Sequence, residues 1–384
     1  RTAPSATRSA QARKLFSLAL LPLALLSLPG CSQDPLDDLP VPGPIEQPWL
    51  APSSGGRPWN LLVLTLDTTR RDRLSCYGYG SPTTPNLDRL ADEGVLFERA
   101  ITPVPITLPA HATLLTGLDP SEHGVRNNGT FVLDPHHVTL AEALQAQGYA
   151  TGATLGSYTV ASQFGLDQGF DRYDDSFPST SRTRERETLQ RTADQVTDNV
   201  IAQLRDHVTR RPDQPFFHWA HYFDPHFPYA PPADYKDRFG DYAGEIAFMD
   251  AEIGRLMAEL DRLGLRANTW ILCVADHGEA FGEHQESTHG MLLYSATIRV
   301  PCILTPPAEW RDLPNKDARG RRVAETIGLK DLAPTLINAV GLPAVTLPAT
   351  GSSLLPLLAG QWDGPRVVYT ETLMPYLDYG WSEL

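Results

Sequence analysis

The chain has 384 residues, 41% of them hydrophobic, and a formal net charge of -14 at pH 7. A chain of this length and composition can bury a substantial core, so we expect one large domain. The acidic charge argues against nucleic acid as a partner, because non-specific binding needs a basic surface that displaces counterions from phosphates. An anionic substrate would therefore have to be held by a local positive site.

The first 30 residues have the layout of a secretory signal. Basic residues between positions 8 and 14 precede an apolar segment at 15–29, which is shorter than the ~20 residues that a spanning helix needs. The end of this segment, LPGC, resembles a bacterial lipoprotein cleavage site, in which Cys31 becomes the lipid-bearing first residue. The alternative is an ordinary signal peptide with an incidental cysteine. We expect export to the bacterial cell envelope and a lipid anchor that makes the membrane a partner, in the periplasm or on the surface.

The rest of the chain divides into a tether and one domain. Residues 31–58 are rich in proline, acidic and small residues, which predicts a tether partly stiffened by polyproline II structure. From 59 to 384, strand-length apolar runs alternate with amphipathic segments, which predicts an α/β domain with a mostly parallel sheet between helical layers. The expected strands are 60–67, 149–156, 215–222, 269–276, 300–305 and 366–372, and the expected helices are 85–94, 139–148, 184–207, 242–263 and 330–340.

Two cysteines, Cys273 and Cys302, lie inside apolar strand-like runs, and Cys76 lies in an expected loop. A disulfide between Cys273 and Cys302 would suit an oxidising compartment. Buried free thiols are the interpretation that we favour.

Two aspartates close strand-like runs. Asp67 ends the run NLLVLTLD, and Asp276 follows TWILCVA in the string ADHGE. Ligands bind at the carboxyl ends of the strands in parallel α/β sheets, so both side chains are expected at the binding edge. One aspartate at a strand end is often a helix cap, but two at the same edge favour a shared site.

The residues around the second aspartate indicate a metal site. Asp276 and His277 form a compact pair of ligands, and Gly278 lets the chain turn away closely. Asp67 would supply a third ligand, which leaves a position open to a hydroxyl group. Thr107, the first residue of TLPAHATLLTG, is either a plain helix cap or that hydroxyl. Beside a metal and at the positive end of a helix, Thr107 would be activated as a nucleophile.

A series of motifs resembles the successive blocks of the sulfatase family within the alkaline phosphatase superfamily. They occur in order over about residues 60–301 and read NLLVLTLDTTRRDRLSCYGY, TTPNLDRLADEGVLFERA, TLPAHATLLTG, SEHGV, HYFDPHFPY, ADHGEAFGEH and LYSATIRVP. The resemblance implies an alkaline-phosphatase-like three-layer α/β/α sandwich, a divalent metal, and a hydrolase that forms a covalent intermediate on residue 107. Sulfatases continue into a small antiparallel C-terminal subdomain, so we interpret this sequence, which also lacks an initiator methionine, as a truncated fragment.

The chain departs from the family at positions that carry chemistry. Sulfatases that use formylglycine have Cys or Ser in a C/S-x-P-x-R string, whereas residues 107–111 read TLPAH here, so no formylglycine is expected. The family's double aspartate is Asp67-Thr68, and its frequent DN pair is Asp276-His277. Because imidazole replaces a hard oxygen ligand, we expect one zinc or manganese ion, with calcium as the alternative. Its ligands would be Asp67, Thr107, Asp276 and His277.

Other site residues are implied by their positions in the family blocks. His226 and His289 match catalytic residues that grip the oxygens of the transferred group. The alternative is a second metal held by Asp224, His226 and His289, although the Asp-x-His spacing differs from the usual one. Asn128 matches an asparagine that contacts the substrate in phosphonate hydrolases, with a turn asparagine as the alternative. His111 is a candidate contact for a substrate anion in place of the missing arginine.

Two further polar residues have structural interpretations. We interpret His221 in HYFDPHFPY as a histidine that packs within a strand. Arg70 follows the first expected ligand and could supply positive potential, but a salt-bridged surface role is favoured.

A threonine nucleophile at a transition metal resembles the phosphodiesterase, phosphonate hydrolase and envelope phosphotransferase branches of the superfamily. A formylglycine hydrate expels sulfate from its own carbon, whereas a threonine ester must be cleaved by water at sulfur or phosphorus. We expect an exported hydrolase that cleaves sulfate or phosphate monoesters or diesters through an intermediate on Thr107. A phosphoethanolamine-type envelope transferase and a non-catalytic sulfatase-like binding domain are the alternatives.

Overall fold

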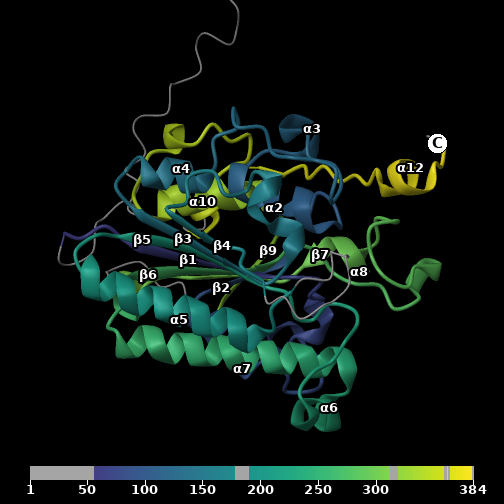
Figure 1. Ribbon diagram of the computed structural model, residues 1–384, viewed down its shortest axis with the longest axis horizontal. Helices are drawn as coiled ribbons and strands as arrows, with labels where there is room; N and C mark the ends of the chain where they lie inside the picture. The colour runs from purple at the N-terminus through teal and green to yellow at the C-terminus, as the bar shows by residue number, and fades with distance from the viewer. Residues whose placement is uncertain (1–55, 178–189, 312–318, 359–360, 362–363, 383–384) are drawn as a thin grey trace, which may run out of the picture. The chain divides into compact units, whose positions relative to one another are not determined.

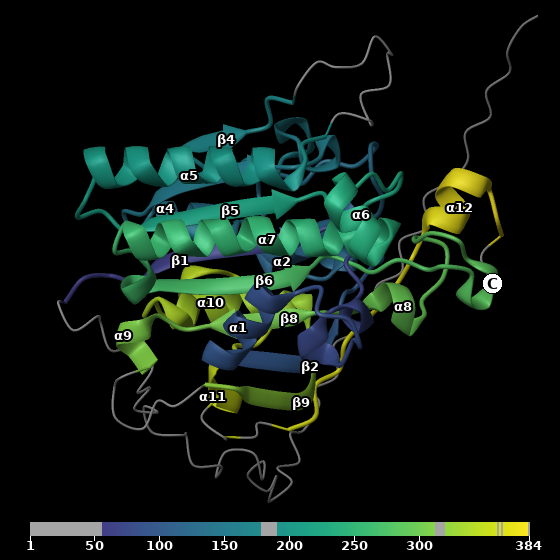
Figure 2. The ribbon, with the colours of Figure 1, turned by 90° about the horizontal axis from the view of Figure 1, so that it is seen from below.

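The fold is built on a mixed β-sheet with β1 (Asn60–Leu66) near its middle. The computed structural model describes residues 56–177, 190–311, 319–358, 361 and 364–382, all within the unit Gln47–Leu384. In these residues the sheet has nine strands in the order β4-β3-β5-β1-β6-β8-β2-β7, and β9 also pairs with β2 (Figure 2). The pairs that β8 makes with β6 and β2, and that β7 makes with β2, are antiparallel, and the other pairs are parallel. The other strands are β2 (Val95–Ile101), β3 (Ala150–Leu155), β4 (Arg172–Asp174), β5 (Phe216–Tyr222), β6 (Thr269–Ala275), β7 (Arg299–Val300), β8 (Cys302–Thr305) and β9 (Arg321–Gly328).

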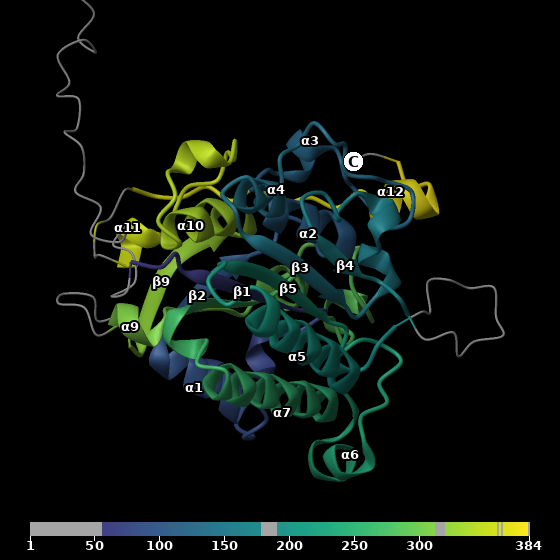
Figure 3. The same ribbon diagram turned by 60° about the vertical axis from the view of Figure 1, so that its left-hand side comes forward.

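Helices cover both faces of the sheet. The long helices α5 (Ala193–Arg210) and α7 (Asp241–Arg262) lie on one face, and α2 (Thr107–Thr116), α4 (Leu140–Gln145) and α10 (Leu332–Ala339) lie on the other (Figures 1 and 3). This arrangement is the three-layer α/β/α sandwich that the sequence predicts. The remaining helices are α1 (Pro85–Glu93), α3 (Pro120–His123), α6 (Ala233–Phe239), α8 (Ser295–Ile298), α9 (Ala308–Arg311), α11 (Leu355–Leu358) and α12 (Met374–Tyr379).

The three central strands decide where the site forms. Every residue of β1, β5 and β6 is buried, as their nearly continuous apolar sequences require of parallel strands covered on both faces. The register pairs Leu66 at the end of β1 with Tyr222 on β5 and with Ala275 on β6. Since these strands end at the same level, the residues that follow them emerge at one edge of the sheet.

Most of the expected elements are present, and a few differ. The expected strand 366–372 is wrong, because this segment forms no strand among the described residues and Val367 is 88% exposed. Strands β2, β4 and β9 were not predicted; β9 has the mixed sequence RRVAETIG and, among the described residues, pairs with β2 alone. The helix expected at 184–207 begins at Ala193 and ends at Arg210, and residues 184–189 lie outside the described part.

The structure tests the prediction for the cysteines but not the predictions for the N-terminal residues. Cys273 and Cys302 are buried free cysteines, which confirms the interpretation that we favoured. The signal peptide, Cys31 and the tether up to residue 55 lie outside the described residues, so export and lipidation stay predictions. In the described part of the chain, no helix has both the length and the hydrophobicity to cross a membrane.

The central position of β1 gives a stability prediction. Leu64 is fully buried, so Leu64→Ala should lower the free energy of unfolding by about 2–5 kcal/mol. The matched control is Leu377→Ala at a side chain that is 41% exposed, which should cost less than about 0.5 kcal/mol. Urea denaturation measures both values, and equal losses in the two variants would contradict the burial of β1.

Candidate active site

Three segments bring the expected metal ligands together at the carboxyl edge of the sheet. Asp67 follows β1, while Asp276 and His277 follow β6, and each of these residues is at most 1% exposed. Thr107 is the first residue of α2 and is 2% exposed. The structure therefore places the three side chains from the strand ends beside the first turn of a helix.

The ring of His277 defines the centre of this group. Its Nε2 lies 3.3 Å from Thr107 Oγ1, 3.5 Å from Asp276 Oδ2 and 3.7 Å from Asp67 Oδ1. Its Nδ1 lies 3.0 Å from the carbonyl oxygen of Gly278. Because a carbonyl can only accept, Nδ1 carries the proton and Nε2 presents a lone pair. A lone pair, two carboxylates and a hydroxyl are a suitable ligand set for one divalent cation.

The two carboxylates lack the partners that buried charges need. Among the described residues, no hydrogen bond reaches either oxygen of Asp67 or Oδ2 of Asp276. Burial raises the pKa of Asp276 to about 6, and burial, followed by the charges of Asp276 and Glu279, raises the pKa of Asp67 well above its ordinary value. An unpaired buried carboxylate costs several kcal/mol, and a bound cation removes that cost. The residues therefore fit a metal ion.

The hydroxyl of Thr107 is not a helix cap. The N-cap position of α2 is Ile106, and the backbone amide of Leu108 donates to Asn128 Oδ1 at 2.9 Å. Asn128 thus satisfies an amide that a capping side chain of α2 would otherwise take, and it stands beside Thr107 as expected of a substrate contact. The Thr107 hydroxyl is left facing His277 at the positive end of a ten-residue helix.

His289 and His226 extend the site beyond the metal ligands. The ring centroid of His289 lies 4.3 Å from that of His277 and 5.7 Å from that of His226. Nδ1 of His289 lies 3.1 Å from Glu279 Oε1. His226 donates from Nδ1 to the carbonyl of Phe227 at 2.7 Å, and burial, followed by the charge of His289, lowers its pKa to about 4. His226 is therefore neutral near pH 7, whereas His289 has a carboxylate partner.

The alternative second metal finds no support in the geometry. The described residues contain two groups with ligand atoms mutually within 4.8 Å, one of Asp67, Asp276 and His277 and one of His111, His221 and Asp276, and neither includes Asp224. The carboxylate of Asp224 instead lies at the start of α5; burial raises its pKa to about 7, while a hydrogen bond from the Ala193 amide opposes the rise. The structure does not bring Asp224, His226 and His289 together as ligands.

His111 requires a correction. We expected a contact with the substrate anion, but the ring is fully buried, and both of its nitrogens already have partners. Nδ1 lies 2.8 Å from the carbonyl oxygen of Thr107, and Nε2 lies 3.0 Å from Thr65 Oγ1. The helical spacing of four residues turns His111 back toward β1 and away from the open side of the site.

Two residues near the site escaped the sequence interpretation. His221 lies with Nε2 3.6 Å from Asp67 Oδ2, and neither ring nitrogen has a hydrogen-bond partner in the described part of the chain. Within β5 its ring also packs against His111 and Trp219, as expected, so its proximity to Asp67 is an additional feature. Glu279 is 1% exposed and pairs with His289; burial opposes its ionisation, but that hydrogen bond and neighbouring histidine charges lower its pKa overall. Its position two residues after His277 was the sequence signal that could have placed Glu279 near the site.

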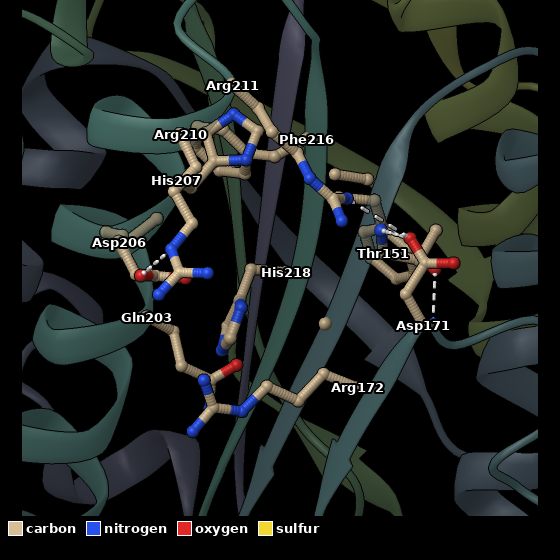
Figure 4. Close-up of a pocket in the computed structure, with 14 residues that line it drawn as sticks. Thr151, Asp171, Arg172, Gln203, Asp206, His207, Arg210, Arg211, Phe216 and His218 are labelled. Atoms are coloured by element: carbon tan, nitrogen blue, oxygen red, sulfur yellow. Dashed lines mark hydrogen bonds and ion pairs between the residues drawn. The ribbon is translucent and has the colours of Figure 1, made fainter.

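A separate cavity of about 210 Å³ lies where β3 and β5 begin and α5 ends, away from the site (Figure 4). Its lining includes Arg172, Arg210 and Arg211, and the last two pair with Asp206 and Asp171. None of the expected site residues lines this cavity.

Comparison with known proteins now decides the family. A family model described as Sulfatase matches residues 59–342. The chain belongs to the sulfatase family. Arylsulfatase A of Homo sapiens is 28% identical over 362 residues, covering 81% of this chain and 69% of that protein. An arylsulfatase of Clostridium perfringens is 25% identical over 363 residues, covering 73% of this chain and 74% of that protein.

Solved structures agree on the fold of this sulfatase. The phosphonate monoester hydrolase of Agrobacterium radiobacter has a TM-score of 0.65 at 22% identity and covers 81% of this chain and 79% of its own. A protein solved with its substrate D-glucosamine-2-N,6-O-disulfate also has a TM-score of 0.65, at 19% identity, and covers 82% of this chain and 86% of its own. The family assignment makes the chain a hydrolase of ester bonds, and sulfatases of this family depend on a metal.

The buried carboxylates give a prediction about stability and pH. Because folding raises the pKa of Asp67 and Asp276, their protonated forms stabilise the metal-free fold below the ordinary carboxyl pKa, and this contribution is lost as pH rises through each folded pKa, which is about 6 for Asp276. Metal-free Asp67→Asn should therefore melt higher than the metal-free parent at about pH 7.5, with a smaller difference at about pH 5. With zinc the order should reverse, because the variant lacks a ligand.

Differential scanning calorimetry with chelator and with zinc measures these melting temperatures. Asp72→Asn is the control, because Asp72 pairs with Arg70 outside the ligand group. A parent that melts higher than Asp67→Asn in chelator at both pH values would contradict the unpaired state of this carboxylate.

Proposed function

We propose that this sulfatase cleaves sulfate or phosphate esters by direct attack of the Thr107 hydroxyl at sulfur or phosphorus. The observation that carries the proposal is that Thr107 Oγ1 lies 3.3 Å from His277 Nε2, beside both oxygens of Asp67 and Oδ2 of Asp276, which have no hydrogen-bond partner in the described residues. This arrangement couples a candidate nucleophile to a candidate cation site. A side chain that served only as a cap would face the amides of its own helix.

The ligand set favours a single zinc or manganese ion held by Asp67, Asp276, His277 and Thr107. One imidazole nitrogen among oxygen donors suits these metals better than calcium, which prefers oxygen ligands alone. When bound, such an ion acts as a Lewis acid that lowers the pKa of a hydroxyl and neutralises charge on the transferred group. The chain itself supplies the position of each donor atom.

The reaction has two balanced steps. Thr107 Oγ1, whose proton would pass to bulk solvent when the cation binds, forms a bond to sulfur or phosphorus while the bond from that atom to the leaving alkoxide breaks, and the alkoxide takes a proton from His289. Water then attacks the same sulfur or phosphorus, gives a proton to the now neutral His289, and displaces Thr107 Oγ1 as free sulfate or phosphate is released. Both displacements are in line, so the nucleophile and leaving group exchange positions across one atom.

The pairing with Glu279 suits His289 to the acid role. Burial raises the pKa of Glu279, but the hydrogen bond from His289 together with the charges of His289, His277 and His226 lowers it overall, so Glu279 is anionic and suited to stabilise a proton on its partner. His226, with its lowered pKa, is neutral; because its Nδ1 donates to Phe227, its Nε2 carries a lone pair and is assigned to accepting a hydrogen bond from the attacking water. Asn128 is assigned to the transferred group through its amide nitrogen, since Oδ1 accepts from Leu108.

The substrate class rests on both the relatives and the nucleophile. The relatives named as arylsulfatases favour sulfate esters, and the phosphonate monoester hydrolase shows that the fold also accepts phosphorus. A threonine ester must be resolved by attack at its sulfur or phosphorus, which phosphoryl enzymes do routinely. We therefore propose phosphoester cleavage as the faster of the two activities.

The site of action is a further part of the proposal. The signal-like residues 1–30 and Cys31 support export and a lipid anchor in a bacterial envelope. Metabolic labelling with a fatty acid would attach label to the parent and not to Cys31→Ser. An ordinary signal peptide would leave both unlabelled.

The nucleophile is tested by intact mass. After brief incubation of the zinc-loaded protein with an aryl phosphate, the parent should carry a phosphate-sized adduct that Thr107→Ala lacks, and kcat should fall by about 10³-fold or more in this variant. Thr107→Ser should retain the adduct. The matched control is Thr116→Ala, another buried threonine of the same helix whose hydroxyl donates to Ala112.

An aryl sulfate is tested in parallel, and a larger adduct yield from it would reverse the proposed preference. Transfer of the phosphoryl group to an added alcohol instead of water would identify a transferase. Turnover that survives in Thr107→Ala would contradict a threonine nucleophile, and zinc binding without any turnover would indicate a binding domain.

The acid role of His289 predicts a dependence on the leaving group. His289→Asn should slow cleavage of an alkyl ester by about 10²–10⁴-fold, because a poor leaving group needs the proton. Cleavage of a nitrophenyl ester, whose leaving group is stable as an anion, should slow far less. Steady-state kinetics on matched alkyl and nitrophenyl esters measures the difference, and the same loss on both would contradict the assignment.

A further inference from the structure

His111 lies behind the candidate ligands and links three elements of the fold. Its Nδ1 lies 2.8 Å from the carbonyl oxygen of Thr107 in the same helix, and its Nε2 lies 3.0 Å from Thr65 Oγ1 on β1. Nε1 of Trp219 on β5 donates to the same Thr65 oxygen at 2.9 Å. Thr65, His111 and Trp219 are all fully buried. A chain of three hydrogen bonds therefore joins β5, β1 and the first turn of α2.

The direction of each hydrogen bond follows from its partners. The indole nitrogen of Trp219 can only donate, so Thr65 Oγ1 accepts from it and gives its own proton to His111 Nε2. The carbonyl of Thr107 can only accept, so Nδ1 of His111 carries the ring proton. The hydrogen-bond chain thus runs from Trp219 through Thr65 and His111 to Thr107. It fixes the tautomer of the neutral His111 ring with the proton on Nδ1.

This tautomer excludes His111 as a metal ligand. The ligand atoms of His111, His221 and Asp276 lie close enough to hold a cation, with His111 Nδ1 3.7 Å from Asp276 Oδ2. However, Nδ1 bears a proton and the lone pair of Nε2 accepts from Thr65. Neither nitrogen has a lone pair left for a metal.

The two middle residues of the hydrogen-bond chain, Thr65 and His111, are each one structural repeat away from a candidate site residue. Thr65 and Asp67 are two residues apart at the end of β1, so they project from the same side of the strand. His111 and Thr107 are four residues apart in α2 and share one helix face. The hydrogen bond between Thr65 and His111 therefore ties the strand that carries Asp67 to the helix that carries Thr107.

We infer that His111 is a positioning residue that sets the Thr107 hydroxyl relative to Asp67 and His277 through the Trp219–Thr65–His111 chain. The ring packs with centroids 5.3 Å from Trp219 and 4.9 Å from His221, which leaves it no room to swing away. Its effect on turnover rests on the proposed Thr107 nucleophile, whereas its tautomer and hydrogen bonds do not.

The kinetic test compares two substitutions of His111. His111→Asn offers an amide donor in place of Nδ1, so the bond to the Thr107 carbonyl can persist, whereas His111→Phe keeps the volume and removes both bonds. We expect kcat to fall by about 100-fold in His111→Phe and by less than about tenfold in His111→Asn, with KM and the zinc dissociation constant nearly unchanged, because a small displacement of a reacting group is costly. Thr65→Val should also lower kcat and, combined with His111→Phe, add little further loss.

The matched control is His123, a second buried histidine beside α2. Its Nε2 pairs with Thr113 Oγ1 at 3.0 Å, but it has no bond to Thr107 or Thr65 among the described residues. His123→Phe should leave kcat unchanged even if it lowers the melting temperature. If kcat fell as much in His123→Phe as in His111→Phe, general destabilisation of the fold would explain both losses, and the inference would be overturned.

A spectroscopic arm separates this inference from the proposed function. Nitrogen-15 NMR of the histidine rings should show His111 protonated at Nδ1 in the parent and also in Thr65→Val, because the Thr107 carbonyl still accepts from Nδ1, whereas the Nε2 resonance should shift in the variant because its hydrogen-bond donor is lost. The opposite tautomer in the parent would overturn the inference whatever the activity. If no ester is cleaved but the tautomer is as expected, the proposed function fails while the hydrogen-bond chain stands; if esters are cleaved and His111→Phe retains full kcat, only the inference fails.

Discussion

The site depends on two buried carboxylates, three of whose four oxygens have no hydrogen-bond partner among the described residues. Asp67 and Asp276 follow neighbouring strands whose every residue is in the core, so the pairing of β1 with β6 forces both charges into one dry space. Alone, this arrangement would repel and destabilise the fold. A divalent cation converts the same repulsion into attraction, so the sheet register that creates the electrostatic cost also creates the metal site.

The surrounding elements resolve a conflict at the start of α2. A threonine in the first turn of a helix normally satisfies a backbone amide, which would occupy the hydroxyl. Here Asn128 takes the amide of Leu108, and His111 holds the carbonyl of Thr107 from the other side. The backbone of Thr107 is thus bonded to other residues, and its hydroxyl is left to face His277. The Thr107 hydroxyl is free of the helix backbone because Asn128 and His111 bond the neighbouring backbone groups.

Sequence reasoning succeeded where the signal was local and failed where it was not. The buried strands could be predicted because parallel strands covered on both faces are continuously apolar. Asp67 and Asp276 could be placed at one edge of the sheet because each ends such a run. His111 was misplaced because a side chain's direction depends on helix phase against the sheet. His221 looked like packing, since its nearness to Asp67 arises only from the β1–β5 register. The segment 366–372 has the β-branched and aromatic residues typical of strands, but it forms no strand, and Val367 is 88% exposed.

The charge balance of the site explains why, in the proposed mechanism, a cation must bind before the anionic substrate. The metal-free site presents the carboxylates of Asp67, Asp276 and Glu279, and the chain as a whole is acidic. Arg70, which follows the first ligand, cannot offset them, because its guanidinium already pairs with Asp72 and Glu283 and donates to the carbonyl of Glu279. In the proposed mechanism, attraction for a sulfate or phosphate group then falls to a cation held by Asp67, Asp276 and His277, the N-terminus of α2 and His289. On this proposal the metal and the anion bind in one linked equilibrium, set by charges that lie within a few residues of the ends of β1 and β6.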